Sequence, residues 1–167
     1  MLKQILLNNI IKEMKICRRL STKIPADKMD FKSKEDTRSI RELLHYLSYI
    51  GTGTIQYWYR TDDSDFKTFF TGLKAKAAEY KPEEFIAAMD EQIKIANNLF
   101  EKITEDDLYT KIVDYPWKET APLSEAIIET NIKWLTAYKL QLFSLIKLAT
   151  DQKLTTPDAW RLTEITG

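Results

Sequence analysis

The chain has few of the side chains that usually perform acid–base chemistry or bind transition metals. His45 is the only histidine and Cys17 the only cysteine among 167 residues. A single cysteine excludes an intramolecular disulfide and a thiolate metal cluster. His45 could be a metal ligand, a general base or a hydrogen-bonded core residue, and we favour the core residue. Local spacing places no serine or cysteine nucleophile beside a base.

Glu42 is the carboxylate best placed to act together with His45. The two residues are three positions apart, which puts them about 60° apart around a helix. A divalent metal held by this pair is therefore one hypothesis for the site. Ser39 and Glu42 also form the Ser-x-x-Glu pattern of a helix capping box, in which the glutamate accepts a hydrogen bond from the backbone. We favour the capping role for Glu42.

Composition and charge exclude several classes of function. Lys plus Arg and Asp plus Glu each number 25, and this balance argues against a nucleic-acid-binding protein, which normally carries a basic excess. The four glycines form no phosphate-binding loop. No apolar run is long enough to cross a membrane, and charged residues interrupt the first twenty positions, unlike a signal peptide. We expect a cytoplasmic protein whose residues 1–167 form a single domain.

Hydrophobic periodicity predicts four long helices and therefore an all-α four-helix bundle with short accessory helices. The long helices are expected over about residues 2–20, from the Ser39 capping box to about 59, from Pro82 to about 100, and from about Pro122 to 149. In the last of these, Ile128, Leu135, Leu142 and Ala149 repeat at heptad distance on one line. Shorter helices are expected over 65–78, capped by Ser64, and from Thr156 through Trp160. Residues 108–117 are predicted as an extended connection, and no run of strands is expected.

Three segments carry a resemblance to a known family. They are IPADKMDF (residues 24–31), TRSIRELLH (residues 37–45) and WLTAYKLQL (residues 134–142). Together they resemble the DinB-like family, in which a proline-containing loop leads into a helix that presents a histidine. The last long helix of that family carries a pattern similar to His-x-x-x-His-Arg-x-Gln-Leu. The order of helices is similar over nearly the whole chain.

The resemblance implies a four-helix bundle around a divalent metal, often nickel or zinc, held by three histidines. The family includes thiol-dependent transferases and isomerases. His45 stands at the first ligand position, but Trp134 and Tyr138 stand at the other two. An indole offers no lone pair to a metal, and a phenol ionises only near pH 10. We therefore expect that the three-histidine site is lost and that no cofactor is bound.

The space where that metal would lie could be an open pocket or a filled core. Helical angle groups Asn131, Trp134, Tyr138 and Gln141 on one side of the last long helix, and His45 and Tyr49 would face them from the second. These six residues are the predicted pocket lining, although close packing of the large rings would fill the same space.

Two functions follow as hypotheses. The first is a small-ligand-binding or protein-interaction module without a metal. The second is a divalent-metal-dependent transferase or hydrolase, of the thiol-dependent transferase type, with an atypical site around His45. Five aromatic residues of the second helix (Tyr46, Tyr49, Tyr57, Trp58 and Tyr59) suggest a homodimer interface, unless a loop or short helix covers them. A nucleic acid or a membrane is not expected as a partner.

Overall fold

The computed structural model describes residues 1–162, and residues 163–167 of the predicted domain lie outside the described residues. The chain is mostly helical with one two-stranded sheet, in agreement with the predicted all-α class. The long helices are α1 (Leu2–Ser21), α2 (Ile40–Trp58), α4 (Phe85–Lys102) and α7 (Lys133–Ala149). The other helices are η1 (Ala26–Lys28), α3 (Phe66–Ala78), η2 (Pro82–Glu84), α5 (Asp107–Thr110), α6 (Leu123–Ile127), η3 (Ile128–Ile132) and α8 (Thr156–Trp160).

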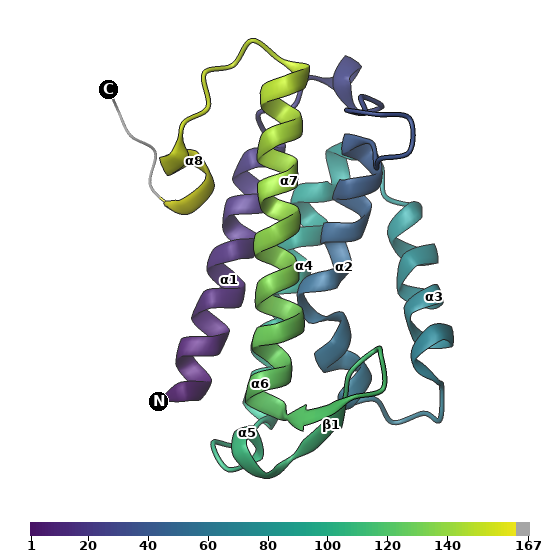
Figure 1. Ribbon diagram of the computed structural model, residues 1–167, viewed down its shortest axis with the longest axis vertical. Coiled ribbons are helices and arrows are strands. Elements are labelled where there is room, and N and C mark those ends of the chain that lie inside the picture. Colours follow the sequence, from purple (N-terminus) through teal and green to yellow (C-terminus); the bar gives the residue numbers. More distant parts are fainter. Residues whose placement is uncertain (163–167) are drawn as a thin grey trace.

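The four long helices lie side by side around a common apolar core (Figure 1). Helices α1 and α2 each pack against both α4 and α7, whereas α1 and α2 have few contacts with each other. Helix α3 packs on the outer side of α2, and α8 packs against α1 and α7. In the described part of the chain, no helix combines the length and the apolar character needed to cross a bilayer.

The predicted start of α2 is confirmed in atomic detail. The Ser39 hydroxyl accepts a hydrogen bond from the Glu42 amide at 3.1 Å, and the Glu42 carboxylate accepts one from the Ser39 amide at 2.7 Å. This is the reciprocal pattern of a capping box. The predicted cap of α3 is wrong by one residue, because Asp65 accepts from the Thr68 amide at 2.7 Å.

Two segments differ from the sequence prediction. Residues 108–117 are not simply an extended connection, since α5 runs into them and strand β1 (Ile112–Asp114) follows. β1 pairs antiparallel with β2 (Thr120–Pro122), in a register that places Val113 opposite Ala121. The strands were missed because each has only three residues, which is too short for alternation to be recognised.

The fourth predicted helix contains a π-helical segment, η3, between α6 and α7. A π turn is wider than an α turn and shifts the angular phase of the residues before it. Ile128, which the heptad line placed inward, is accordingly 40% exposed. Thr130 and Asn131 are instead fully buried.

Helices α1 and α7 share a buried ion pair. The Lys139 ammonium lies 2.6 Å from a carboxylate oxygen of Glu13, and the two side chains are 0% and 11% exposed. The ring of Trp160 on α8 covers the ammonium, with its centroid 4.0 Å away. Cys17 lies one turn beyond Glu13, and burial, followed by the Glu13 charge, raises the pKa of its thiol.

We predict that Glu13→Gln lowers the free energy of unfolding by about 3–5 kcal/mol, because it leaves the Lys139 charge buried without a counterion. Urea unfolding followed by circular dichroism measures this loss. The double variant Glu13→Leu/Lys139→Met removes both charges and is expected to recover most of it.

Glu129→Gln is the matched control, since Glu129 forms an exposed ion pair with Lys133 one turn away. Its loss is expected to stay below about 1 kcal/mol. Equal losses for Glu13→Gln and Glu129→Gln would contradict a structural role for the buried pair.

Candidate functional site

Three tyrosine rings meet where α2 lies against α7. The rings of Tyr46 and Tyr138 have centroids 4.6 Å apart at an interplanar angle of 69°. Tyr46 also meets Tyr49 edge-on, at 5.3 Å and 76°. Edge-to-face packing of this kind stabilises the rings beyond the burial of their apolar surface. We name Tyr46, Tyr49 and Tyr138 the tyrosine cluster.

Arg38 lies on this cluster from the loop before α2. Its guanidinium carbon is 4.5 Å from the centroid of the Tyr46 ring and 5.2 Å from that of Tyr138. These distances are within the range of cation–π attraction. The guanidinium therefore has a preferred position although its side chain is exposed.

Beside the cluster lies a hollow of about 470 Å³, which we name the tyrosine hollow. Its lining residues come from α2, from the loop before it and from α3: Arg38, Glu42, His45, Tyr46, Tyr49, Lys74 and Ala78. The volume is in the range of small-molecule sites. Aromatic rings on one side and charged groups at the rim would allow it to hold a molecule with apolar and polar parts.

The Glu42 carboxylate already has a hydrogen-bond donor and a cation as partners within the protein. Its hydrogen bond from the Ser39 amide is the main cause that lowers its pKa, and Lys32 lies 3.5 Å from it. The pKa values of Tyr46 and Tyr49 are raised, chiefly by burial. At neutral pH both phenols are therefore neutral. The charged lining residues are Glu42, whose carboxylate already has partners, and the cations Arg38 and Lys74.

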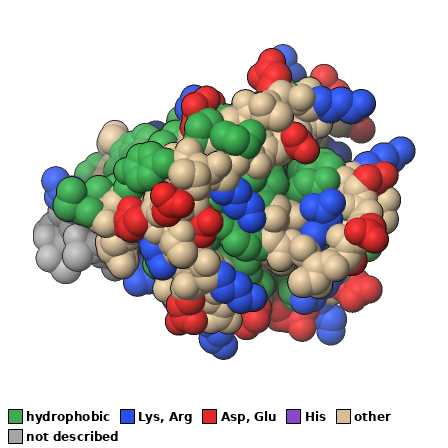
Figure 2. Space-filling model, turned by 90° about the horizontal axis from the view of Figure 1, so that it is seen from below, with side chains coloured by type: hydrophobic (Ala, Val, Ile, Leu, Met, Phe, Trp, Pro, Cys, Tyr) green, Lys and Arg blue, Asp and Glu red, His purple; other side chains and the backbone are tan. Residues whose placement is uncertain are grey.

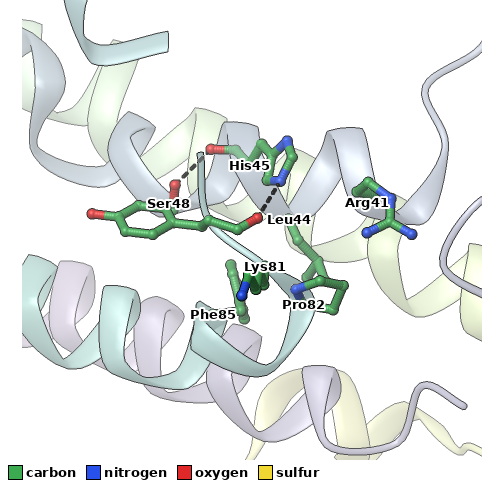
Figure 3. A pocket seen from close by; sticks show the side chains of 8 residues that line it. Arg41, Leu44, His45, Ser48, Lys81, Pro82 and Phe85 are labelled. Carbon is green, nitrogen blue, oxygen red and sulfur yellow. Dashed lines mark hydrogen bonds between the residues drawn. The ribbon is translucent and has the colours of Figure 1, made fainter. Parts of the chain in front are cut away.

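His45 is held by the connection between α3 and α4. Its Nε2 atom is 2.9 Å from the backbone carbonyl oxygen of Tyr80 (Figure 3). Next to this hydrogen bond is a smaller hollow of about 10 Å³, which Arg41, Ser48 and Phe85 help to line. The ring thus ties α2 to the chain that follows α3.

The residues present do not fit the metal that the family resemblance implies. His45 and Glu42 both have partners within the protein, and Tyr138 packs edge-on against Tyr46. Within residues 1–162, no three His, Cys, Asp or Glu side chains are grouped so that they could hold a metal ion. The described residues therefore offer no ready set of ligands for that metal.

The six predicted pocket residues lie in different surroundings. His45 and Tyr49 line the tyrosine hollow, and Tyr138 contacts Tyr46, which lines it. Asn131 is in the core, where it accepts from the Thr54 hydroxyl at 2.7 Å and donates to the Gly51 carbonyl at 3.0 Å.

The other two predicted residues point elsewhere along α7. The Trp134 ring lies 6.5 Å from the ring of Trp117, in the turn between β1 and β2. Gln141 is half-buried and is not among the residues that line the tyrosine hollow. The structure therefore brings part of the predicted set together and disperses the rest.

The aromatic residues at the end of α2 have contacts within their own chain. Tyr57 packs edge-on against Phe66 and Phe69 of α3. The Trp58 indole donates to the Asp114 carbonyl at 2.9 Å, and Lys111 lies 3.6 Å from the centroid of the Tyr59 ring. These contacts weaken the basis on which the homodimer was predicted, and the homodimer itself stays a prediction.

Some of the exposed apolar side chains lie at the end of the molecule formed by α5 and the two strands. The most exposed of them are Tyr109, Ile112 and Trp117, at 62%, 58% and 49%. Seen from this end, apolar side chains are interspersed with charged ones (Figure 2).

Arg38 and Lys74 of the hollow were not singled out by the sequence. Arg38 stands in the segment of residues 37–45 that resembles the family, and it precedes the Ser39 cap. This proximity to a recognisable helix start is the one signal that could have identified it. Lys74 carries no such signal, because only the packing of α3 on α2 brings it to the hollow.

The sequence matches no protein-family model and no curated protein. The likeness to the DinB-like family therefore rests on the three quoted segments and the order of helices. The tyrosine hollow is the feature of the structure that indicates a binding site.

Proposed function

We propose that this protein is a DinB-like four-helix bundle that binds a small organic molecule in the tyrosine hollow and uses no metal there. The single observation that carries the proposal is the hollow itself. About 470 Å³ of space is lined by the aromatic side chains of Tyr46 and Tyr49 and by the charged side chains of Arg38 and Lys74. A concave, partly aromatic site with few polar groups is typical of small-molecule binding.

The packing of the long helices supports the DinB-like part of the proposal. Each of α1 and α2 contacts both α4 and α7, which is the arrangement expected of a four-helix bundle. His45 and Tyr138, at two of the family's ligand positions, lie on the facing helices α2 and α7. The tyrosine cluster thus occupies the region in which the family resemblance would place the metal.

The metal-dependent transferase or hydrolase is the second candidate, and the retained His45 is what favours it. It would need further ligands around that ring. Trp134 cannot supply one, and Glu42 is bound to Ser39 and Lys32. The ligand-binding function needs no such rearrangement, and for this reason we place it first.

Filling the hollow is expected to weaken binding. Ala78→Phe would place a ring in the tyrosine hollow and so remove the apolar space for a ligand. We predict that this change weakens the binding of 2-naphthoate at least about tenfold. Saturation-transfer NMR measures the binding. Ala87→Phe is the control, because Ala87 is also exposed on a helix and has the same change in helix propensity. Equal binding to both variants, or no binding of either 2-naphthoate or its amide to the unmodified protein, would contradict the proposal.

Metal content separates the two candidate functions. We predict that protein expressed with added zinc, nickel or manganese and then dialysed contains far less than one metal ion per chain by elemental analysis. His45→Ala should give the same low value. A stoichiometric metal that is lost in His45→Ala would overturn the metal-free site and favour the transferase or hydrolase.

A further inference from the structure

The groups at the rim of the tyrosine hollow indicate which class of molecule it takes. We infer that the ligand is a carboxylate attached to a flat apolar body, with Arg38 and Lys74 holding the carboxylate. This inference rests on the proposed function and adds the chemical class of the ligand.

Within residues 1–162 the Arg38 guanidinium has no hydrogen-bond acceptor as a partner. The guanidinium carbon lies 4.5 Å from the centroid of the Tyr46 ring and 5.2 Å from that of the Tyr138 ring, and these cation–π contacts occupy none of the oxygen acceptors that its N–H groups could bind. Its N–H groups point along the plane of the guanidinium, where two of them match the two oxygens of a carboxylate. Among residues 1–162, no carboxylate forms an ion pair with Arg38.

Lys74 adds a second cation from α3, on the same hollow. No acidic side chain of the described residues lies within ion-pair distance of it either. Glu42, the one acidic lining residue, is held by the Ser39 amide and Lys32. The hollow therefore has an excess of positive charge, although the whole chain has a net charge of zero.

The start of α2 offers no additional donors for a more highly charged anion. The amides of Ile40, Arg41 and Glu42 donate to the Phe31 carbonyl, the Met29 carbonyl and the Ser39 hydroxyl. A phosphate group at a helix start is normally held by such backbone amides. With these occupied, two side-chain cations remain, and they suit a single carboxylate.

The rest of the hollow suits an apolar body. Its lining includes the apolar parts of Tyr46, Tyr49 and Ala78. Both phenols stay neutral at physiological pH, since burial raises their pKa values. An aromatic carboxylate would place its ring against the tyrosines and its charge at Arg38.

Matched acids and amides test this inference. Calorimetric titrations with benzoate against benzamide, and 2-naphthoate against 2-naphthamide, compare ligands of equal shape that differ in charge. We expect each acid to bind about tenfold more tightly than its amide, because hydrogen bonds to charged groups are the strong ones. In Arg38→Gln the preference should fall to about threefold or less, whereas Lys67→Gln, an exposed change on α3 away from the hollow, should preserve it.

The outcomes separate this inference from the proposed function. If acid and amide bind equally and both are lost in Ala78→Phe, the hollow binds small molecules but the carboxylate assignment is wrong. A preference for the acid that is unchanged in both Arg38→Gln and Lys74→Gln would also overturn the assignment. If no acid and no amide binds to the unmodified protein, both the inference and the proposed function fail.

Discussion

The buried ion pair between Glu13 and Lys139 fixes how α7 is rotated against α1. A lysine that is 0% exposed has to keep its counterion, so this face of α7 cannot turn away from α1. Successive helical residues lie about 100° apart. Tyr138, the preceding residue, is thereby directed toward α2, where it meets Tyr46 and completes the tyrosine cluster. The position of the candidate site thus depends on a charge pair on another face of the same helix.

A polar network within the core fixes the register of the same helix. Thr54 and the Gly51 carbonyl on α2 are joined to Asn131 in η3 by hydrogen bonds of 2.7 and 3.0 Å. Gly51 also permits a close approach, because an added Cβ would lie 2.5 Å from the end of the Met14 side chain and 3.0 Å from Leu135. The π segment turns Asn131 inward to make these bonds. The centre of the molecule is consequently filled, and the tyrosine hollow lies at the side, between α2 and α3.

Much of the fold could be predicted from the sequence because its signals are local. The Ser39 capping box and the 3.6-residue apolar period determine where α1, α2, α4 and α7 lie along the chain. The π segment has no comparable signal, and it moved Ile128 outward and Asn131 into the core. Spacing also assigns residues to a face of one helix but gives no distance between helices. Tyr138 and Tyr49 each pack edge-on against Tyr46, whereas Trp134 lies beside Trp117. Lys74 lines the hollow through the packing of α3 on α2.

The most direct test of the account is to map where a small molecule binds. Backbone amide chemical shifts would be recorded by two-dimensional NMR while 2-naphthoate, and separately 2-naphthamide, is added. We expect the largest shift changes in residues 38–49 and 74–78, which carry the lining of the tyrosine hollow. Changes confined to α1 and α8, or no changes with either molecule, would contradict it.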